Sequence, residues 1–210
     1  MPRTQPERSE ATRAALVGAA RRLFAEHGYN AVGIEAVVRE VGVTRGALYH
    51  QFEDKAELFA KVFEEVGQDL MDRLAVAVGK LEGTGTTHDL LLAGIGIWLD
   101  ACADPEVQRI ILLDGPAVLG WQRWRELDRG ASLGLVEAIV ATAIEDGTVD
   151  PELAARPTTH VLIGALDEAA MYIVGSDDPV QARAEVTPVL EGLLSGILTP
   201  KAKRRAARRA

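Results

Sequence analysis

Apolar residues recur along the chain at three- and four-residue spacing, which is typical of helices buried on one face. Glycine and proline divide this pattern into segments, and no stretch shows the apolar and polar alternation of a β-strand. The spacing therefore predicts an all-α fold of about nine helices. In chain order, the expected helices are 9–27, 34–41, 44–51, 54–81, 87–103, 105–113, 117–146, 158–174 and 179–198.

The first quarter of the chain combines two short helical segments with a tight turn. Apolar residues lie on one face of segment 34–41, Gly42 lets the chain reverse, and Thr44 can cap the helix that follows. Leu48 is expected in the core, whereas the side chains at 45–47 are short or polar and face outward. This arrangement predicts a helix-turn-helix, whose second helix enters the major groove of DNA.

Two stretches of this region resemble the DNA-binding head of the TetR/AcrR family. They are AARRLFAEHGY at 19–29 and GVTRGALYHQFEDKAELF at 42–59. The resemblance implies a three-helix head on a helical body that binds a ligand and dimerises. It also implies a transcriptional repressor that a small molecule releases from DNA.

The same resemblance implies which side chains contact DNA. Arg45 matches a position that reads a base, where a bidentate contact to guanine is its expected use. The two small residues after it match positions that pack on base edges, and the others match phosphate contacts. The expected DNA contacts are Thr44, Arg45, Gly46, Ala47, Tyr49, His50 and Lys55. At Val32 and Gly33 the chain departs from the family, which usually has hydroxyl residues there, one of them capping the second helix.

The body contains aromatic residues and carboxylates that together would suit an apolar or cationic ligand. The residues expected around a pocket are Trp98, Asp114, Trp121, Trp124, Asp167 and Met171. Two interpretations remain open for the tryptophans, which either line this pocket or fill gaps between helices. For Asp167, the alternatives are pocket polarity and an ion pair across a dimer seam.

The last two long segments, 158–174 and 179–198, are rich in glycine and alanine, which let helices approach closely. Two such helices from each of two chains would form a four-helix interface, and the family resemblance implies a homodimer of this kind. A two-fold dimer would place its recognition helices about 34–36 Å apart, which predicts a pseudo-palindromic operator.

Charge is distributed unevenly along the chain. Residues 1–55 carry eight Lys and Arg against seven Asp and Glu, whereas residues 56–200 carry nine against twenty-four. The last ten residues carry six positive charges and no negative ones. We expect a DNA-binding domain over 1–55, a ligand-binding and dimerisation domain over 56–200, and a disordered basic tail over 201–210. The tail either adds phosphate contacts or is a solvated extension.

Other classes of protein are less consistent with the sequence. The chain has no P-loop, GxSxG or HExxH motif and no metal-ligand spacing of histidines, so we expect no enzyme, metal or cofactor. A single cysteine, a polar start and the lack of a long apolar run favour a cytoplasmic protein without membrane association. The alternatives are an enzyme or ligand-binding protein with an incidental helix-turn-helix, a DNA binder without an effector, and an activator.

Overall fold

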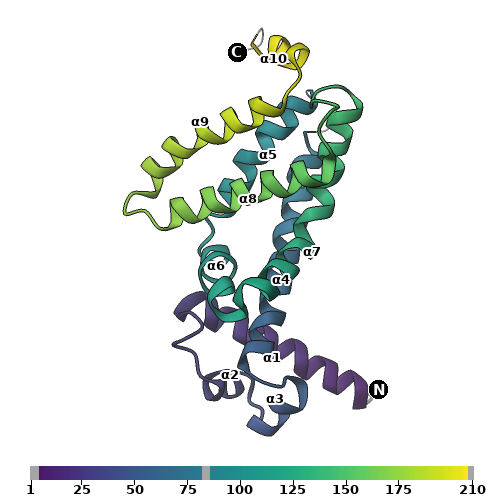
Figure 1. Cartoon of the computed structure of the whole chain (residues 1–210). Helices are drawn as coiled ribbons and strands as arrows, with labels where there is room; N and C mark the ends of the chain where they lie inside the picture. The colour runs from purple at the N-terminus through teal and green to yellow at the C-terminus, as the bar shows by residue number, and fades with distance from the viewer. Residues whose placement is uncertain (1–4, 82–85, 208–210) are drawn as a thin grey trace. The chain divides into compact units, whose positions relative to one another are not determined.

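The computed structural model describes residues 5–81 and 86–207, and within them the chain forms ten α-helices, one π-helical segment and no β-strand (Figure 1). Side chains at 128–132 and 205–207 are not described. The elements are α1 (Gln5–His27), α2 (Ile34–Val41), α3 (Arg45–Gln51), α4 (Lys55–Gly79), α5 (Thr87–Ala101), α6 (Pro105–Val107), η1 (Gln108–Asp114), α7 (Gly115–Glu145), α8 (Ala155–Val174), α9 (Pro179–Ile197) and α10 (Pro200–Ala207). The all-α prediction is confirmed. None of the described helices is long and apolar enough to cross a membrane.

The chain packs as two compact units. The head unit comprises Met1–Gln68 with Pro105–Asp128, and the body unit comprises Asp69–Asp104 with Arg129–Ala210. The head unit is therefore larger than the domain of residues 1–55 that the sequence analysis expected. It also contains segments 56–68 and 105–128. Helices α4 and α7 each contribute turns to both units.

A small aromatic core holds the head unit together. Phe24 of α1 and Phe59 of α4 are fully buried, and their ring centroids lie 5.5 Å apart. Tyr29 packs edge-on against Phe59 at 5.2 Å. Helix α1 ends just before Gly28, whose φ of +78° suits glycine and whose N–H donates to Phe24 O at 2.8 Å. These contacts fix α1 against the start of α4.

The segment after Pro105 differs from the prediction of two helices joined at Gly115-Pro116. Helix α6 passes into η1 and then into α7 without a break at Gly115. Pro116 follows the π-helical turns of η1, where the regular α-helical hydrogen bonding is already interrupted, so its missing N–H does not end the helix. Gly115 serves close packing, because a Cβ there would lie 2.7 Å from Phe63 Cε2. The break comes instead at Gly120, where φ is 72°.

The C-terminal segment also differs from the prediction, because residues 200–207 form α10 in place of a disordered tail. Its alanine, lysine and arginine residues are strong helix formers. Thr199 Oγ1 accepts the Ala202 N–H at 3.2 Å, and Ala202 packs against the buried cluster of Ala143, Val149 and Leu198. Residues 208–210 of the predicted tail and the predicted glycine break at 83–85 lie outside the described residues.

Candidate DNA-binding surface and effector cavity

The turn between α2 and α3 is set by local backbone geometry. Helix α2 ends at Gly42, which takes a φ of +76°, a conformation that side-chain-bearing residues rarely adopt. The N–H groups of Gly42 and Val43 both donate to Val38 O, at 2.9 and 3.0 Å. At the other end of α2, Gly33 is the N-cap and offers no side-chain oxygen, and Val32 is buried. The turn is therefore held by two backbone hydrogen bonds, while the start of α2 lacks a side-chain cap.

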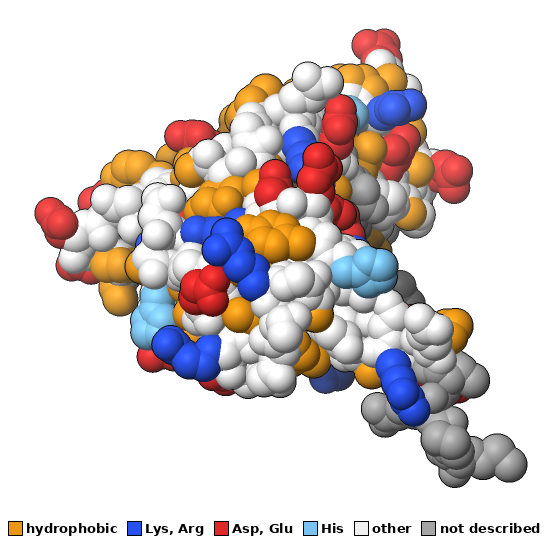
Figure 2. Space-filling model, turned by 90° about the horizontal axis from the view of Figure 1, so that it is seen from below, with side chains coloured by type: hydrophobic (Ala, Val, Ile, Leu, Met, Phe, Trp, Pro, Cys, Tyr) orange, Lys and Arg blue, Asp and Glu red, His pale blue; other side chains and the backbone are white. Residues whose placement is uncertain are grey.

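Helix α3 buries one side and exposes the other. Thr44 caps it, because Thr44 Oγ1 accepts the Ala47 N–H at 3.2 Å. Leu48 is fully buried beneath the helix, and Ala47 is half-buried. The exposed residues are Thr44, Arg45, Gly46, Tyr49 and His50. In the view from below, Lys, Arg and His side chains are interspersed with Asp, Glu and exposed apolar side chains (Figure 2).

Arg45 is held by two neighbours on this exposed face. Its Nη1 donates to Glu35 Oε1 of α2 and its Nη2 to the Tyr49 hydroxyl, both at 3.3 Å. The guanidinium carbon also lies 5.3 Å from the centroid of the Tyr49 ring. The side chains of Arg45 and Glu35 are 61% and 69% exposed, so water and DNA can compete for this ion pair.

Lys55, at the start of α4, packs against Tyr29. Its Nζ lies 3.9 Å from the centroid of the Tyr29 ring. Asp114 at the end of η1 accepts the backbone N–H of Tyr29 at 2.7 Å. Burial lowers the pKa of the Lys55 ammonium, and the Asp114 carboxylate opposes that shift. Asp114 therefore serves the head unit by holding the segment that supports Lys55.

A two-bond ion pair joins α1 to α6 within the head unit. Arg21 Nε donates to Glu106 Oε1 at 2.7 Å, and Arg21 Nη2 donates to Glu106 Oε2 at 2.8 Å. Both side chains are about three-quarters buried. A bidentate pair of this kind fixes direction as well as distance. The segment 105–128 is thereby attached to the helix that supports α2 and α3.

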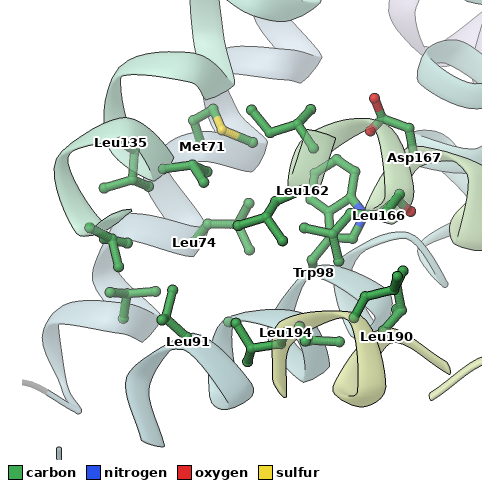
Figure 3. Close-up of a pocket in the computed structure, with 18 residues that line it drawn as sticks. Met71, Leu74, Leu91, Trp98, Leu135, Leu162, Leu166, Asp167, Leu190 and Leu194 are labelled. Carbon is green, nitrogen blue, oxygen red and sulfur yellow. Dashed lines mark hydrogen bonds between the residues drawn. The ribbon is translucent and has the colours of Figure 1, made fainter. Parts of the chain in front are cut away.

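The body unit contains a cavity of about 120 Å³, which 18 residues of α4, α5, α7, α8 and α9 line. All of them except Gly94 and Asp167 carry mainly apolar side chains. Figure 3 shows the Trp98 indole among leucines, with Asp167 and Leu135 at opposite sides of the view. Trp98 Nε1 donates to Leu166 O at 3.3 Å. The cavity is therefore lined mainly by apolar side chains.

Within residues 5–81 and 86–207, no three His, Cys, Asp or Glu side chains come close enough together to hold a metal ion.

Two family profiles match the chain. The one described as "Bacterial regulatory proteins, tetR family" matches residues 16–62, and "Tetracyclin repressor-like, C-terminal domain" matches residues 88–197, more than half of the chain. The chain belongs to the TetR family of transcriptional regulators. This agrees with the expectation that the chain is not an enzyme, because the relatives of this TetR-family regulator are named as regulators and repressors.

Individual relatives extend the same conclusion. The Transposon Tn10 TetC protein of Escherichia coli is 30% identical over 142 residues, which are 68% of this chain and 70% of that protein. A crystal structure of a TetR-family regulator from Pectobacterium atrosepticum is 31% identical, with a TM-score of 0.81 over 94% of this chain and 98% of that one. FadR from Bacillus subtilis, solved with stearoyl-CoA, has a TM-score of 0.67 over 88% and 98% of the two chains, and at 22% identity it shows a shared fold alone.

The structure separates the six residues that the sequence analysis grouped around a pocket. Trp98 and Asp167 line the cavity. Asp114 lies in the head unit, as do Trp121, which is 67% exposed, and Trp124, which is buried. Met171 is exposed on α8 and does not line the cavity. In this TetR-family regulator, the tryptophans and carboxylates of the sequence therefore did not identify the cavity, whose lining depends on how the helices pack.

Other site residues escaped the sequence analysis. Glu35 faces Arg45 across the turn, and the Arg21–Glu106 pair spans 85 residues of sequence. The aliphatic lining of the cavity, such as Leu74, Leu162 and Leu194, looks in the sequence like ordinary helix core. Helical spacing places Glu35 on the exposed side of α2, one turn from Arg39, but does not show which cation it meets.

Proposed function

We propose that this TetR-family regulator is a repressor that binds a pseudo-palindromic operator as a homodimer and is released by a small molecule in the body cavity. The observation that carries the proposal is the two-sided character of α3. Its polar side chains are exposed around Arg45 while Leu48 beneath them is fully buried, so the helix is anchored and free to enter a groove. We also propose that it acts in the cytoplasm, where a bacterial regulator meets the chromosome.

Each residue of the predicted DNA-binding set has a proposed role toward DNA. Arg45 reads a guanine through its planar guanidinium, and Gly46 and Ala47 allow close approach to base edges. The phosphate contacts come from the remaining residues, which are Thr44, Tyr49, His50 and Lys55. The N-terminus of α3, capped by Thr44, adds the positive end of a helix dipole near the phosphates.

The proposed dimer uses α8 and α9, which lie side by side in the body unit (Figure 1). Six of the ten large apolar side chains that are exposed in the described chain lie on these two helices. They are Val161, Met171, Tyr172, Val180, Val189 and Leu193. Exposed apolar side chains concentrated on one helix pair favour an interface with a second copy.

We propose that the effect of ligand binding is transmitted from the cavity to the head through helices that belong to both units. Helix α4 packs Phe59 in the head core and lines the cavity with Met71 and Leu74. A ligand that binds better to one orientation of α4 would shift the population towards it. Coupling of about 1–3 kcal/mol between effector and operator is the usual scale.

The test is selection of bound fragments from the host genome, followed by gel shift with the selected duplex. We expect a two-fold related site, and we expect the Arg45→Ala variant to bind it roughly 10- to 100-fold more weakly. Arg39→Ala removes a comparable exposed charge from α2 and serves as the control, with a smaller effect on all duplexes alike. If no duplex is preferred over another, or if Arg45→Ala changes nothing, the proposed function is wrong.

A further inference from the structure

The body cavity has a size and a lining that restrict what it can bind, and this inference rests on the proposed effector role. We propose that the cavity takes a small apolar molecule, about the size of one aromatic ring, that carries no negative charge.

Cavity size argues for a single ring. The space between the lining side chains is about 120 Å³. An apolar protein cavity of about 150 Å³ is known to accept benzene, whereas sites for drug-sized ligands run from about 300 to 1,000 Å³. A ligand much larger than one ring would therefore have to push apart side chains such as Met71 and Leu194 to fit wholly inside.

The lining argues against an anion. Among the described lining residues none is Lys, Arg or His, and the single ionisable side chain is that of Asp167, itself an acid. Trp98 carries the one side-chain N–H among them, and that group already donates to Leu166 O. A carboxylate or phosphate brought into such a space loses its hydration without gaining a cation or a free donor from the lining, which costs several kcal/mol. Hydrocarbon, in contrast, gains from leaving water.

The experiment compares three probes of one size that differ in charge: toluene, benzylammonium and benzoate. Binding to the full chain is measured by titration calorimetry without DNA, and operator release by gel shift with each probe. We expect toluene to bind and benzoate to bind at least about tenfold more weakly than either of the other two. Benzoate binding as tight as toluene binding would overturn the proposal.

A pair of matched variants tests whether binding takes place in this cavity. Gly94 lines the cavity and a Cβ there meets nothing within 4 Å, so Gly94→Val adds bulk at the cavity wall without a backbone clash. Gly96→Val makes the same change on the same helix, where a Cβ also meets nothing within 4 Å but the residue is not part of the lining. We expect Gly94→Val to abolish toluene binding and Gly96→Val to leave it within about twofold.

The outcomes separate this inference from the proposed function. If toluene binding survives in Gly94→Val, or if no probe binds to a protein that still binds its operator, the ligand class is wrong and the DNA-binding proposal stands. If probes bind as expected in calorimetry but no operator is found, the cavity chemistry stands and the proposed repressor function fails.

Discussion

The exposed face of α3 and the cavity of the body unit are the two candidate binding regions, and they are built in opposite ways. The α3 face gathers polar side chains from one run of seven residues and leaves them exposed to solvent. The cavity gathers apolar side chains from five helices, between Met71 and Leu194 in sequence. A contact on α3 is thus assigned to one residue, whereas the cavity depends on packing over more than half of the chain.

The same difference predicts how each region responds to change. A single substitution on the α3 face removes one identifiable contact and leaves the fold alone. The body unit is expected to act collectively, because it shapes the cavity and, in the proposed dimer, joins two heads. The predictions below test this division, starting with the body, where the largest effect is expected.

The largest effect is expected from a charge on the proposed dimer face. Val189 on α9 is 59% exposed in the single chain. If α8 and α9 meet a second copy, Val189→Asp buries an unpaired carboxylate at each half of the interface and weakens dimerisation on the order of 100-fold. Operator affinity should fall in parallel, because a single head makes half of the contacts.

A matched control exists in the same unit. Val76 on α4 is also 59% exposed, and Val76→Asp should leave both dimerisation and operator binding within about twofold of the parent protein. Sedimentation and gel shift measure the two quantities. Equal behaviour of the two variants would contradict a dimer through α9.

The second prediction concerns how the head unit is held together. Glu106→Ala removes the two hydrogen bonds that this carboxylate accepts from the partly buried Arg21 guanidinium, so we expect a loss of about 1–3 kcal/mol in the free energy of unfolding. Thermal denaturation measures it. Glu40→Ala removes an exposed partner of Arg22 from the same unit and should cost no more than about 0.5 kcal/mol. Similar losses in both variants would show that the α1–α6 pair is not structural.

Whether a feature could be predicted from the sequence depends on how far apart in the chain the residues lie that determine it. The bounds of α2 and the Thr44 cap of α3 were predicted correctly, because Gly42 and Thr44 act on their own neighbours in the chain. The attachment of segment 105–128 to the head was not predicted. It depends on Arg21 and Glu106, two charged residues among many, which no local pattern pairs.

The cavity escaped prediction for a related reason. Tryptophans and carboxylates draw attention in a sequence, but Trp121 and Trp124 lie in the head unit, and Asp114 binds the backbone of Tyr29. Whether a leucine such as Leu74 lines a cavity or fills a core depends on small gaps between helices, and hydrophobic periodicity is the same in both cases. Gly115 shows the same limit, since its close approach to Phe63 replaces the expected helix break.

The third prediction separates phosphate contact from base reading within the head. Lys55→Met keeps an apolar side chain against the Tyr29 ring but removes the charge. We expect operator and unrelated duplexes to be bound about fivefold more weakly alike, with the salt slope smaller by about one. Lys80→Met, an exposed change in the body unit, is the control and should leave the slope unchanged. A loss confined to the operator would assign Lys55 a different role.

The smallest expected effect tests whether Glu35 of α2 changes how the α3 face binds DNA. Glu35 accepts from Arg45 Nη1, so any phosphate that attracts Arg45 has to compete with this carboxylate. In Glu35→Gln that competition weakens, and we expect unrelated duplexes to be bound about two- to fivefold more tightly while operator binding changes less. Specificity, measured as the ratio of the two affinities, should therefore fall.

Removing any negative charge near DNA raises affinity in general, so the design needs two controls. Glu40→Gln removes a charge from the same helix, but its partner is Arg22 and not Arg45. A double-mutant cycle then repeats Glu35→Gln in the Arg45→Ala background, where a specific effect through Arg45 disappears and a general electrostatic effect remains. If Glu35→Gln shifts specificity equally in both backgrounds, Glu35 acts only as a surface charge, and α3 reads DNA without help from α2.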